Sequence, residues 1–185
     1  MTASTLHKFY AGPGLACVST CFVYRCLLLW LFSSLLPVSG GEYGAFSENP
    51  DLPDYSQGFD PARDPFVDGD NALRLARESG RRVLIEAGGE WCMYCKRLDH
   101  YIHGNPMVRE ALYKNFVVLK VNISDKNDNR EFMAGLPKIH AYPHFFITES
   151  DGTLIHSQDT SRFLHRGVYS ESLILEFIDK WGSDN

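Results

Sequence analysis

The sequence predicts an α/β domain with a central mixed sheet and helices on both faces of that sheet. Apolar segments of strand length alternate with segments whose apolar residues recur at helical spacing. A strand, a crossover and a second strand come first, and this order favours parallel pairing. Two later strand-like segments are separated by a tight-turn sequence, which adds antiparallel strands and makes the sheet mixed.

A linker that becomes an ordered lead-in near residues 59–66 is predicted over residues 41–67, because Pro, Asp, Gly and Ser are frequent there and neither a helical nor a strand period holds. The folded domain is predicted over residues 68–182. It begins with a helix at 71–79, and Asp68 or Asp70 can cap that helix.

The first half of the domain alternates helix and strand. Gly80 ends the first helix, and the apolar segment 82–87 is predicted to be a short buried strand. After Gly88-Gly89 the pattern turns helical, and Asn105-Pro106 is typical of the start of another helix. Residues 116–123 are β-branched or apolar at most positions, so we expect a central strand there.

The second half closes the sheet with a hairpin. A short helix at 130–134 precedes two strands, 144–148 and 153–157, which the turn sequence ESDG joins. The closing helix is predicted over about 171–181, where apolar residues recur at core spacing: Leu173, Ile174, Phe177 and Ile178.

The composition bounds the class of partner. The chain has 185 residues, of which 44% are hydrophobic and 13% aromatic, and its formal net charge is −5. This length suits one domain of ordinary size with an appendage. Because there is no basic excess, we expect no nucleic-acid partner, and we expect a monomer.

Residues 1–40 are typical of a targeting segment. The apolar run Cys26–Val38 follows Arg25, and Val38 and Gly40 are small enough to precede a signal-peptidase cut. We therefore predict a signal peptide. The alternative is an N-terminal membrane anchor, for which the uninterrupted run is shorter than the ~20 residues of a span. Either segment predicts that the folded domain lies outside the cytoplasm, where disulfides persist.

Two cysteines at the start of a predicted helix carry the chemistry. Cys92 and Cys95 follow Trp91, and the helix is expected over 92–103. The first turn of a helix has unpaired N–H groups and the positive end of the dipole, which lower the pKa of Cys92, and Lys96 adds positive potential. We predict that Cys92 is the exposed nucleophile that attacks a substrate disulfide and that Cys95 resolves the mixed disulfide.

Metal binding is the main alternative for this pair. A structural zinc site needs four ligands, and after removal of residues 1–40 the remaining cysteines are Cys92 and Cys95. A helix that begins at Cys92 places His103 roughly 16 Å away. A binding module that carries Cu(I) on the two thiols without turnover also remains open. The favoured interpretation needs no cofactor beyond a redox-active disulfide.

Beyond this pair, the chain resembles the thioredoxin-fold thiol–disulfide oxidoreductases over about residues 68–181. VLIEAGGEWCMYCK resembles the strand, active site and helix of that family, and LKVNISD resembles its next strand. AYPHFFI resembles the segment with the cis-proline, and HRGVYSESLILEFI the closing strand and helix, with Gly167 at the family's glycine. The resemblance implies a thioredoxin-like fold.

The resemblance also implies roles for residues around the pair. Glu86 stands where the family often carries a buried acid that shuttles protons to the resolving thiol, and Lys120 matches a lysine that often faces it. A buried Glu86 should have a raised pKa, which suits proton transfer. Trp91, Tyr142 and Pro143 would bind substrate. A cis Pro143 would pack beside the disulfide and leave the backbone of Tyr142 able to pair with an extended chain.

The site also departs from the family pattern. Met93-Tyr94 stand between the cysteines where reducing thioredoxins usually have Gly-Pro, and this dipeptide helps to set the redox poise. Gly88-Gly89 replace bulkier residues, which predicts a more open substrate face. The insert DHYIHGNPMVREALYKNF resembles the secreted subgroup related to the C-terminal domain of the bacterial transmembrane disulfide reductase. This resemblance implies a periplasmic reductase or relay, with cysteine-containing client proteins as partners and a membrane disulfide reductase as electron donor.

Overall fold

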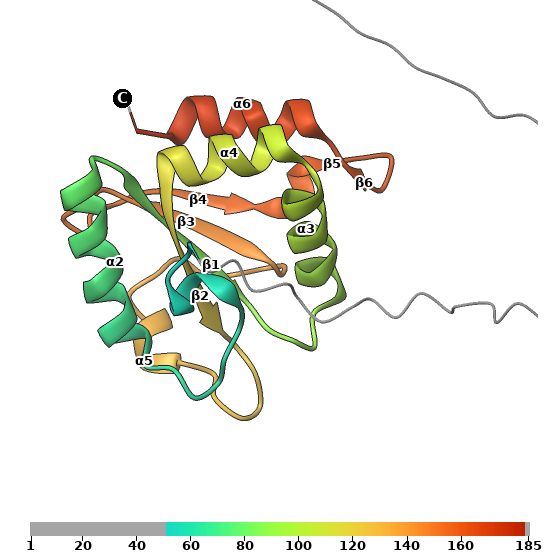
Figure 1. Cartoon of the computed structure of the whole chain (residues 1–185). Coiled ribbons are helices and arrows are strands. Elements are labelled where there is room, and N and C mark those ends of the chain that lie inside the picture. The colour runs from blue at the N-terminus through green and yellow to red at the C-terminus, as the bar shows by residue number, and fades with distance from the viewer. Residues whose placement is uncertain (1–50, 184–185) are drawn as a thin grey trace, which may run out of the picture. The chain divides into compact units, whose positions relative to one another are not determined.

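Six helices and six strands make up the described part of the chain, residues 51–183 of a computed structural model (Figure 1). The predicted targeting segment, 1–40, lies outside the described residues. The α-helices are α1 (Asp54–Gln57), α2 (Pro65–Ser79), α3 (Met93–Gly104), α4 (Pro106–Asn115), α5 (Arg130–Met133) and α6 (Glu171–Trp181). The strands are β1 (Arg82–Gly88), β2 (Phe116–Asn122), β3 (His144–Thr148), β4 (Leu154–Asp159), β5 (Leu164–His165) and β6 (Val168–Tyr169), and a 3-10 helix spans Thr160–Phe163. Within residues 51–183, no helix is both long and apolar enough to span a bilayer.

A four-stranded mixed sheet forms the centre, in the order β2-β1-β3-β4. β1 and β2 are parallel, whereas β3 pairs antiparallel with both β1 and β4. The predicted fold class is therefore confirmed. The register of the parallel pair sets Glu86 directly beside Lys120, which matters for the site described below.

Helices cover both faces of this sheet (Figure 1). α3, α4 and α6 lie on one face, over a core that includes Leu84 and Phe145. α1, α2 and α5 lie on the other face, over a core that includes Leu119 and Phe146. Leu84 and Phe145 alternate with residues of the opposite core along their strands, as the two-residue period of a strand requires. β1, β2 and β3 are thus buried on both sides, which explains their mostly apolar sequences, whereas β4 at the edge of the sheet is only partly buried.

α2 begins earlier than the sequence predicted. Asp64 is its cap, and its carboxylate accepts hydrogen bonds from two backbone N–H groups of the first turn, with Pro65 at the first helical position. Asp68, one of the two expected caps, is instead buried and accepts two hydrogen bonds of 2.6 Å from Arg63. The Asp-Pro start is favoured because proline lacks an N–H group that would be unpaired there. Gly80 ends the helix with a φ of 67°, as predicted.

The lead-in before α2 is ordered, as predicted near residues 59–66, and the order extends back to α1. Tyr55 and Phe59 are buried. The Ser56 hydroxyl donates a hydrogen bond of 2.5 Å to the Val118 carbonyl oxygen of β2. α1 is therefore fastened to the outer strand of the sheet, and the chain that follows it is directed toward the end of β1.

The segment that resembles the family's closing strand does not join the central sheet. β5 and β6 form a separate two-stranded hairpin. Its turn residues, Arg166 and Gly167, have positive φ values of 52° and 81°. Two successive positive φ values characterise the tight turns that join adjacent antiparallel strands. The expected strand role of this segment is therefore corrected to that of a hairpin between the 3-10 helix and α6.

Candidate active site

The cysteine pair lies at the N-terminal end of α3. Cys92 is the cap residue of the helix, and a disulfide joins it to Cys95, with the two Cα atoms 5.2 Å apart. The Cys95 backbone N–H donates a hydrogen bond of 3.1 Å to the Cys92 sulfur. A negative charge on this sulfur would be stabilised by that N–H group and by the helix dipole. The structure thus has the helix-start geometry that the sequence predicted.

Both sulfurs are more buried than the sequence suggested. Cys92 is 4% exposed and Cys95 is 0% exposed, so the predicted exposed nucleophile is largely covered in the disulfide form. Phe59 and Tyr142 pack against the pair. Phe59 comes from the lead-in, whose composition gave no sign of a contact with the active site. Cys92 nonetheless remains the more accessible of the two cysteines, as its predicted role requires.

Three charged side chains share a buried space between β1, β2 and α3. Glu86, Asp99 and Lys120 are all at most 5% exposed. The Lys120 Nζ atom lies 2.5 Å from Asp99 Oδ1 and 3.8 Å from Glu86 Oε2. The parallel register of β1 and β2 accounts for the first pair, and the first turns of α3 bring Asp99 to the same lysine.

The pKa values of Glu86 and Lys120 are both shifted in this buried space. Burial raises the pKa of Glu86 to about 8, repulsion from Asp99 adds to the rise, and Lys120 opposes it. For Lys120, burial lowers the pKa, but attraction to Glu86 and Asp99 outweighs burial and the pKa is raised. At neutral pH, Lys120 therefore keeps its charge while Glu86 mostly keeps its proton. Glu86 Oε1 is buried with no hydrogen-bond partner among the described residues, which leaves this atom able to exchange a proton.

Asp99 is a site residue that sequence reasoning missed. It follows Cys95 by four positions and Cys92 by seven, so all three lie on one side of α3. The sequence signal for Asp99 is an acidic residue on the same side of the helix as the two cysteines, flanked by the core residues Leu98 and Ile102. The resemblance had directed attention only to the acid on the preceding strand.

Trp91 and Tyr142 border the disulfide. The Trp91 side chain is 59% exposed, and its Nε1–H group donates a hydrogen bond of 2.6 Å to the Ile123 carbonyl oxygen. Its ring meets that of Tyr142 edge-on, with centroids 5.6 Å apart. The Tyr142–Pro143 peptide bond is cis. The structure brings Trp91 and Tyr142 to the cysteine pair, while substrate binding by these residues and Pro143 stays a prediction.

The cationic side chains that follow the pair have other partners. The Lys96 Nζ atom lies 3.8 Å from Glu90 Oε2, and both side chains are exposed. Because Glu90 offsets its charge, the predicted effect of Lys96 on the pKa of Cys92 stays a prediction. Arg97 donates a hydrogen bond of 2.7 Å to the Gly167 carbonyl oxygen, which ties α3 to the β5–β6 hairpin.

The glycine pair does not open the substrate face. A Cβ atom on Gly88 would lie 2.7 Å from the Cys95 sulfur and 2.8 Å from Phe59 Cζ. A Cβ atom on Gly89 would lie 2.5 Å from Trp91 Nε1. Real Cβ atoms do not approach so closely. The two glycines are present because Phe59 and Trp91 fill the space, so the prediction of a more open face is wrong.

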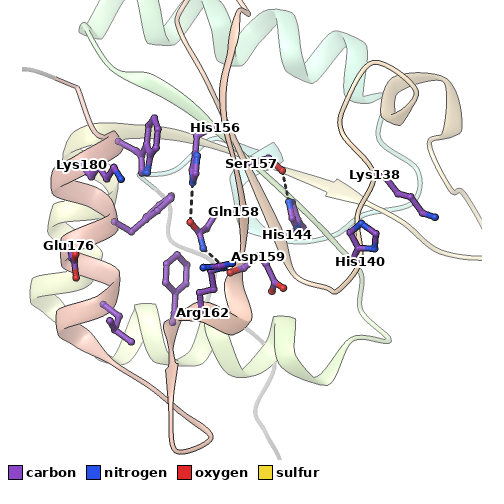
Figure 2. Close-up of a pocket in the computed structure, with 14 residues that line it drawn as sticks. Lys138, His140, His144, His156, Ser157, Gln158, Asp159, Arg162, Glu176 and Lys180 are labelled. Carbon is purple, nitrogen blue, oxygen red and sulfur yellow. Dashed lines mark hydrogen bonds between the residues drawn. The ribbon is translucent and has the colours of Figure 1, made fainter.

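Two hollows of similar size lie on the described surface. The first, the disulfide-side groove, has a volume of about 560 Å³ and is lined by Phe59, Pro61, Glu90, Trp91, Asn122, Ile123, Ser124, Asp125, Lys126 and Asp128. The second, the histidine pocket, has a volume of about 590 Å³ and lies between β4, α6 and the loop before β3 (Figure 2). His140, His144 and His156 line it, together with the cations Lys138, Arg162 and Lys180. Neither Cys92 nor Cys95 contributes to the wall of either hollow, but Phe59 and Trp91, which line the groove, lie beside the pair in space or in sequence.

Comparisons with known proteins agree with the geometry. Residues 65–150 match a family model described as thioredoxin-like. A relative, "Thiol:disulfide interchange protein DsbD" of Pseudomonas fluorescens, is 32% identical over 102 residues, which cover 51% of this chain and 17% of that protein. The chain therefore matches only a small part of the length of this relative.

Solved structures show the same fold. A disulphide isomerase from Xylella fastidiosa aligns with a TM-score of 0.57 at 22% identity, covering 71% of this chain and 98% of that one. The oxidised C-terminal domain of DsbD from Neisseria meningitidis aligns with a TM-score of 0.50 at 15% identity, covering 64% and 96%. Together these findings show that the described part of this chain has a thioredoxin-like fold, with a disulfide at the start of α3 and a sequence similar to part of DsbD.

Proposed function

We propose that this protein acts outside the cytoplasm on the disulfides of other proteins through Cys92 and Cys95, as a reductase or electron relay rather than an oxidase. One observation carries the proposal: a disulfide lies at the start of a helix, and the same helix carries Asp99, which shares Lys120 with a buried carboxyl, Glu86, whose pKa is raised to about 8. That value is close to the ~8.5 of a free thiol, and acid–base pairs transfer protons best when their pKa values are similar.

The reduced pair would act in two steps. The Cys92 thiolate attacks one sulfur of a client disulfide, a bond forms between Cys92 and that sulfur, and the other client sulfur leaves as a thiolate and takes a proton. Cys95 then gives its proton to the fraction of Glu86 that is ionised and attacks the Cys92 sulfur. The disulfide between the two cysteines forms, and the first client sulfur leaves and is protonated. The client gains two electrons and two protons: the cysteine pair supplies both electrons and the one proton of Cys95, and solvent supplies the other proton.

Continued turnover needs an electron donor that reduces the Cys92–Cys95 disulfide again. We assign this role to a membrane disulfide reductase, and we assign the role of acceptor to client proteins that contain cysteines. The similarity to a thiol:disulfide interchange protein supports a role in exchange between thiols and disulfides. The apolar segment within residues 1–40 supports a location outside the cytoplasm, in the periplasm or an equivalent compartment.

Reduction of insulin by dithiothreitol, followed by turbidity, tests the activity. We expect Cys92→Ser to abolish catalysis and Cys95→Ser to accumulate mixed disulfides with insulin, because the resolving thiol is missing. Wild-type rates in both variants would refute the proposal.

The equilibrium redox potential of the pair against glutathione tests the direction. We expect a value near that of thioredoxin, roughly −270 mV, rather than near the roughly −120 mV of a strong oxidant. A value at the oxidising end would replace the reductase with an oxidase or isomerase.

A further inference from the structure

Phe59 lies outside the segment that matches the family model, yet it contacts the redox pair. The match begins at residue 65. Phe59 is 4% exposed and forms one buried cluster with Cys92 and Cys95. The lead-in therefore contributes a side chain to the active site.

The same ring reaches the buried charges. The Lys120 Nζ atom lies 5.1 Å from the centroid of the Phe59 ring, which is within the range of a cation–π interaction. Lys120 in turn holds Asp99 at 2.5 Å and Glu86 at 3.8 Å. One aromatic side chain thus lies against both the sulfur pair and the cation that organises the two carboxyl groups.

Gly88 shows how closely these groups approach one another. A Cβ atom added to Gly88 would lie 2.7 Å from the Cys95 sulfur and 2.8 Å from Phe59 Cζ. The ring, the resolving sulfur and β1 therefore converge on one point that has no room for a methyl group. A space too small for a methyl group is also too small for a water molecule. The close packing at Gly88 therefore keeps water from this side of Cys95.

We propose that Phe59 is a positioning residue of the redox site, whose ring excludes water from Cys95, Glu86 and Lys120 and so keeps the resolving thiol and the proton carrier in an apolar environment. This inference rests on the proposed function and deepens it. It makes the lead-in a working part of the active site.

The consequence of removing the ring follows from solvation. Water admitted beside Glu86 and Cys95 would stabilise the carboxylate and the thiolate, since desolvation disfavours the charged form of an acid. The pKa values of both groups should then fall. If Phe59 were only a core residue, its removal would lower stability and leave both titrations where they are.

The test compares three variants of the full chain: Phe59→Ala, Phe59→Leu and Phe66→Ala. Phe66 is the matched control, because it is an aromatic residue near the start of α2 that is 52% exposed and packs on Phe132, with ring centroids 5.3 Å apart. The readouts are the pH titration of the Glu86 carboxyl by carbon NMR, the titration of the thiols by ultraviolet absorbance, and the redox potential against glutathione.

We expect Phe59→Ala to lower the midpoint of the Glu86 titration by about one pH unit or more, a tenfold change in proton affinity. Phe59→Leu, which keeps an apolar side chain, should shift it by less, and Phe66→Ala should leave it unchanged. Should Phe59→Ala fail to fold, Phe59→Leu still decides the matter through its smaller shift. Unchanged titrations and potential in the folded Phe59 variants would overturn the inference.

The outcome is separable from that of the proposed function. If the wild-type protein reduces no insulin but the Phe59 variants shift the Glu86 and thiol titrations, the proposed activity fails and the shielding role stands. If the wild-type protein reduces insulin but the titrations do not move in the Phe59 variants, the proposed activity stands and the shielding role fails.

Discussion

The disulfide-side groove and the histidine pocket are nearly equal in volume, about 560 and 590 Å³, yet they differ in what lies behind their walls. Behind the groove, Phe59 and Trp91 lead to a disulfide and to three buried, mutually coupled charges. The histidine pocket has more titratable side chains at its surface, but its cations, Lys138, Arg162 and Lys180, are exposed (Figure 2).

The comparison teaches that neither the size of a hollow nor its number of ionisable groups identifies a redox site. Desolvation by the fold shifts the pKa of an ionisable group, and this effect is absent where the group is solvated by water. In the histidine pocket His156 stacks on Trp181, with centroids 3.9 Å apart, and it behaves as part of the packing. Burial does lower the pKa of His144 there, and the Ser157 hydroxyl lies 2.9 Å from its Nε2 atom. No cysteine accompanies His144 on the wall of this pocket in the described part of the chain.

Substitution of a lysine should give the largest difference in stability between the two regions. Lys120→Met would leave Glu86 and Asp99 buried without their positive partner, and breaking a buried pair in this way costs about 3–5 kcal/mol of unfolding free energy. Lys138→Met, the matched change at the exposed rim of the histidine pocket, should cost less than about 0.5 kcal/mol. Urea unfolding of both variants checks this, and equal stabilities would remove the basis of the comparison.

The pH dependence of stability should reveal the raised pKa of Glu86. The folded protein keeps this proton up to about pH 8, whereas the unfolded chain loses it near the ordinary value of 4.5. Because the folded state binds more protons in that window, this group makes the protein less stable as pH rises from 4.5 to 8, by at most about 1.4 kcal/mol per pH unit.

Glu86→Gln should remove that fall, so the variant should gain stability relative to the wild type across this window. Denaturant unfolding at several pH values measures the difference. Glu78→Gln, an exposed change on α2, serves as the control. Parallel pH curves for the wild type and Glu86→Gln would show that Glu86 titrates normally.

A methyl group at Gly88 should test the close packing behind the groove. Gly88→Ala forces the new Cβ against the Cys95 sulfur and the Phe59 ring, and such overpacking costs about 1–3 kcal/mol. A Cβ atom on Gly58 would have nothing within 4 Å, so Gly58→Ala should be nearly neutral. Thermal unfolding compares them, and two equally stable variants would mean that the ring and the sulfur leave more room than described.

The smallest effect is expected in the histidine pocket itself. Arg162→Ala removes an exposed cation that forms no hydrogen bond with the redox residues in the described part of the chain. We expect the insulin-reduction rate to stay within about twofold of the wild type and the stability within about 0.5 kcal/mol. A large loss of activity would show that the two regions are coupled.

Local pattern predicted most of the elements and the chemistry. The strands at the centre were found because burial on both faces makes them apolar throughout, and α6 because its apolar residues recur at helical spacing. The position of Cys92 at a helix start followed from the break at Gly88-Gly89. Glu86 and Lys120 came from the family resemblance, and the parallel register of their strands places them together.

What the sequence did not reveal depends on contacts between distant segments. Phe59 lies in a stretch without any period, and only the folded structure shows it against a pair more than thirty positions later. Asp68 was expected as a helix cap because Asp residues favour that place, but Arg63 binds it in the fold. The separate β5–β6 hairpin likewise could not be inferred from a short apolar segment that suits either arrangement.

The fastening of α1 to β2 through Ser56 has a practical consequence for anyone who expresses this domain. Trimming the chain to the matched region, at residue 65, would delete Tyr55, Ser56 and Phe59 while keeping every cysteine of the motif. Such a fragment would retain both cysteines of the motif but lose the aromatic side chain that packs against them. Shortened versions should therefore start at or before Asp51.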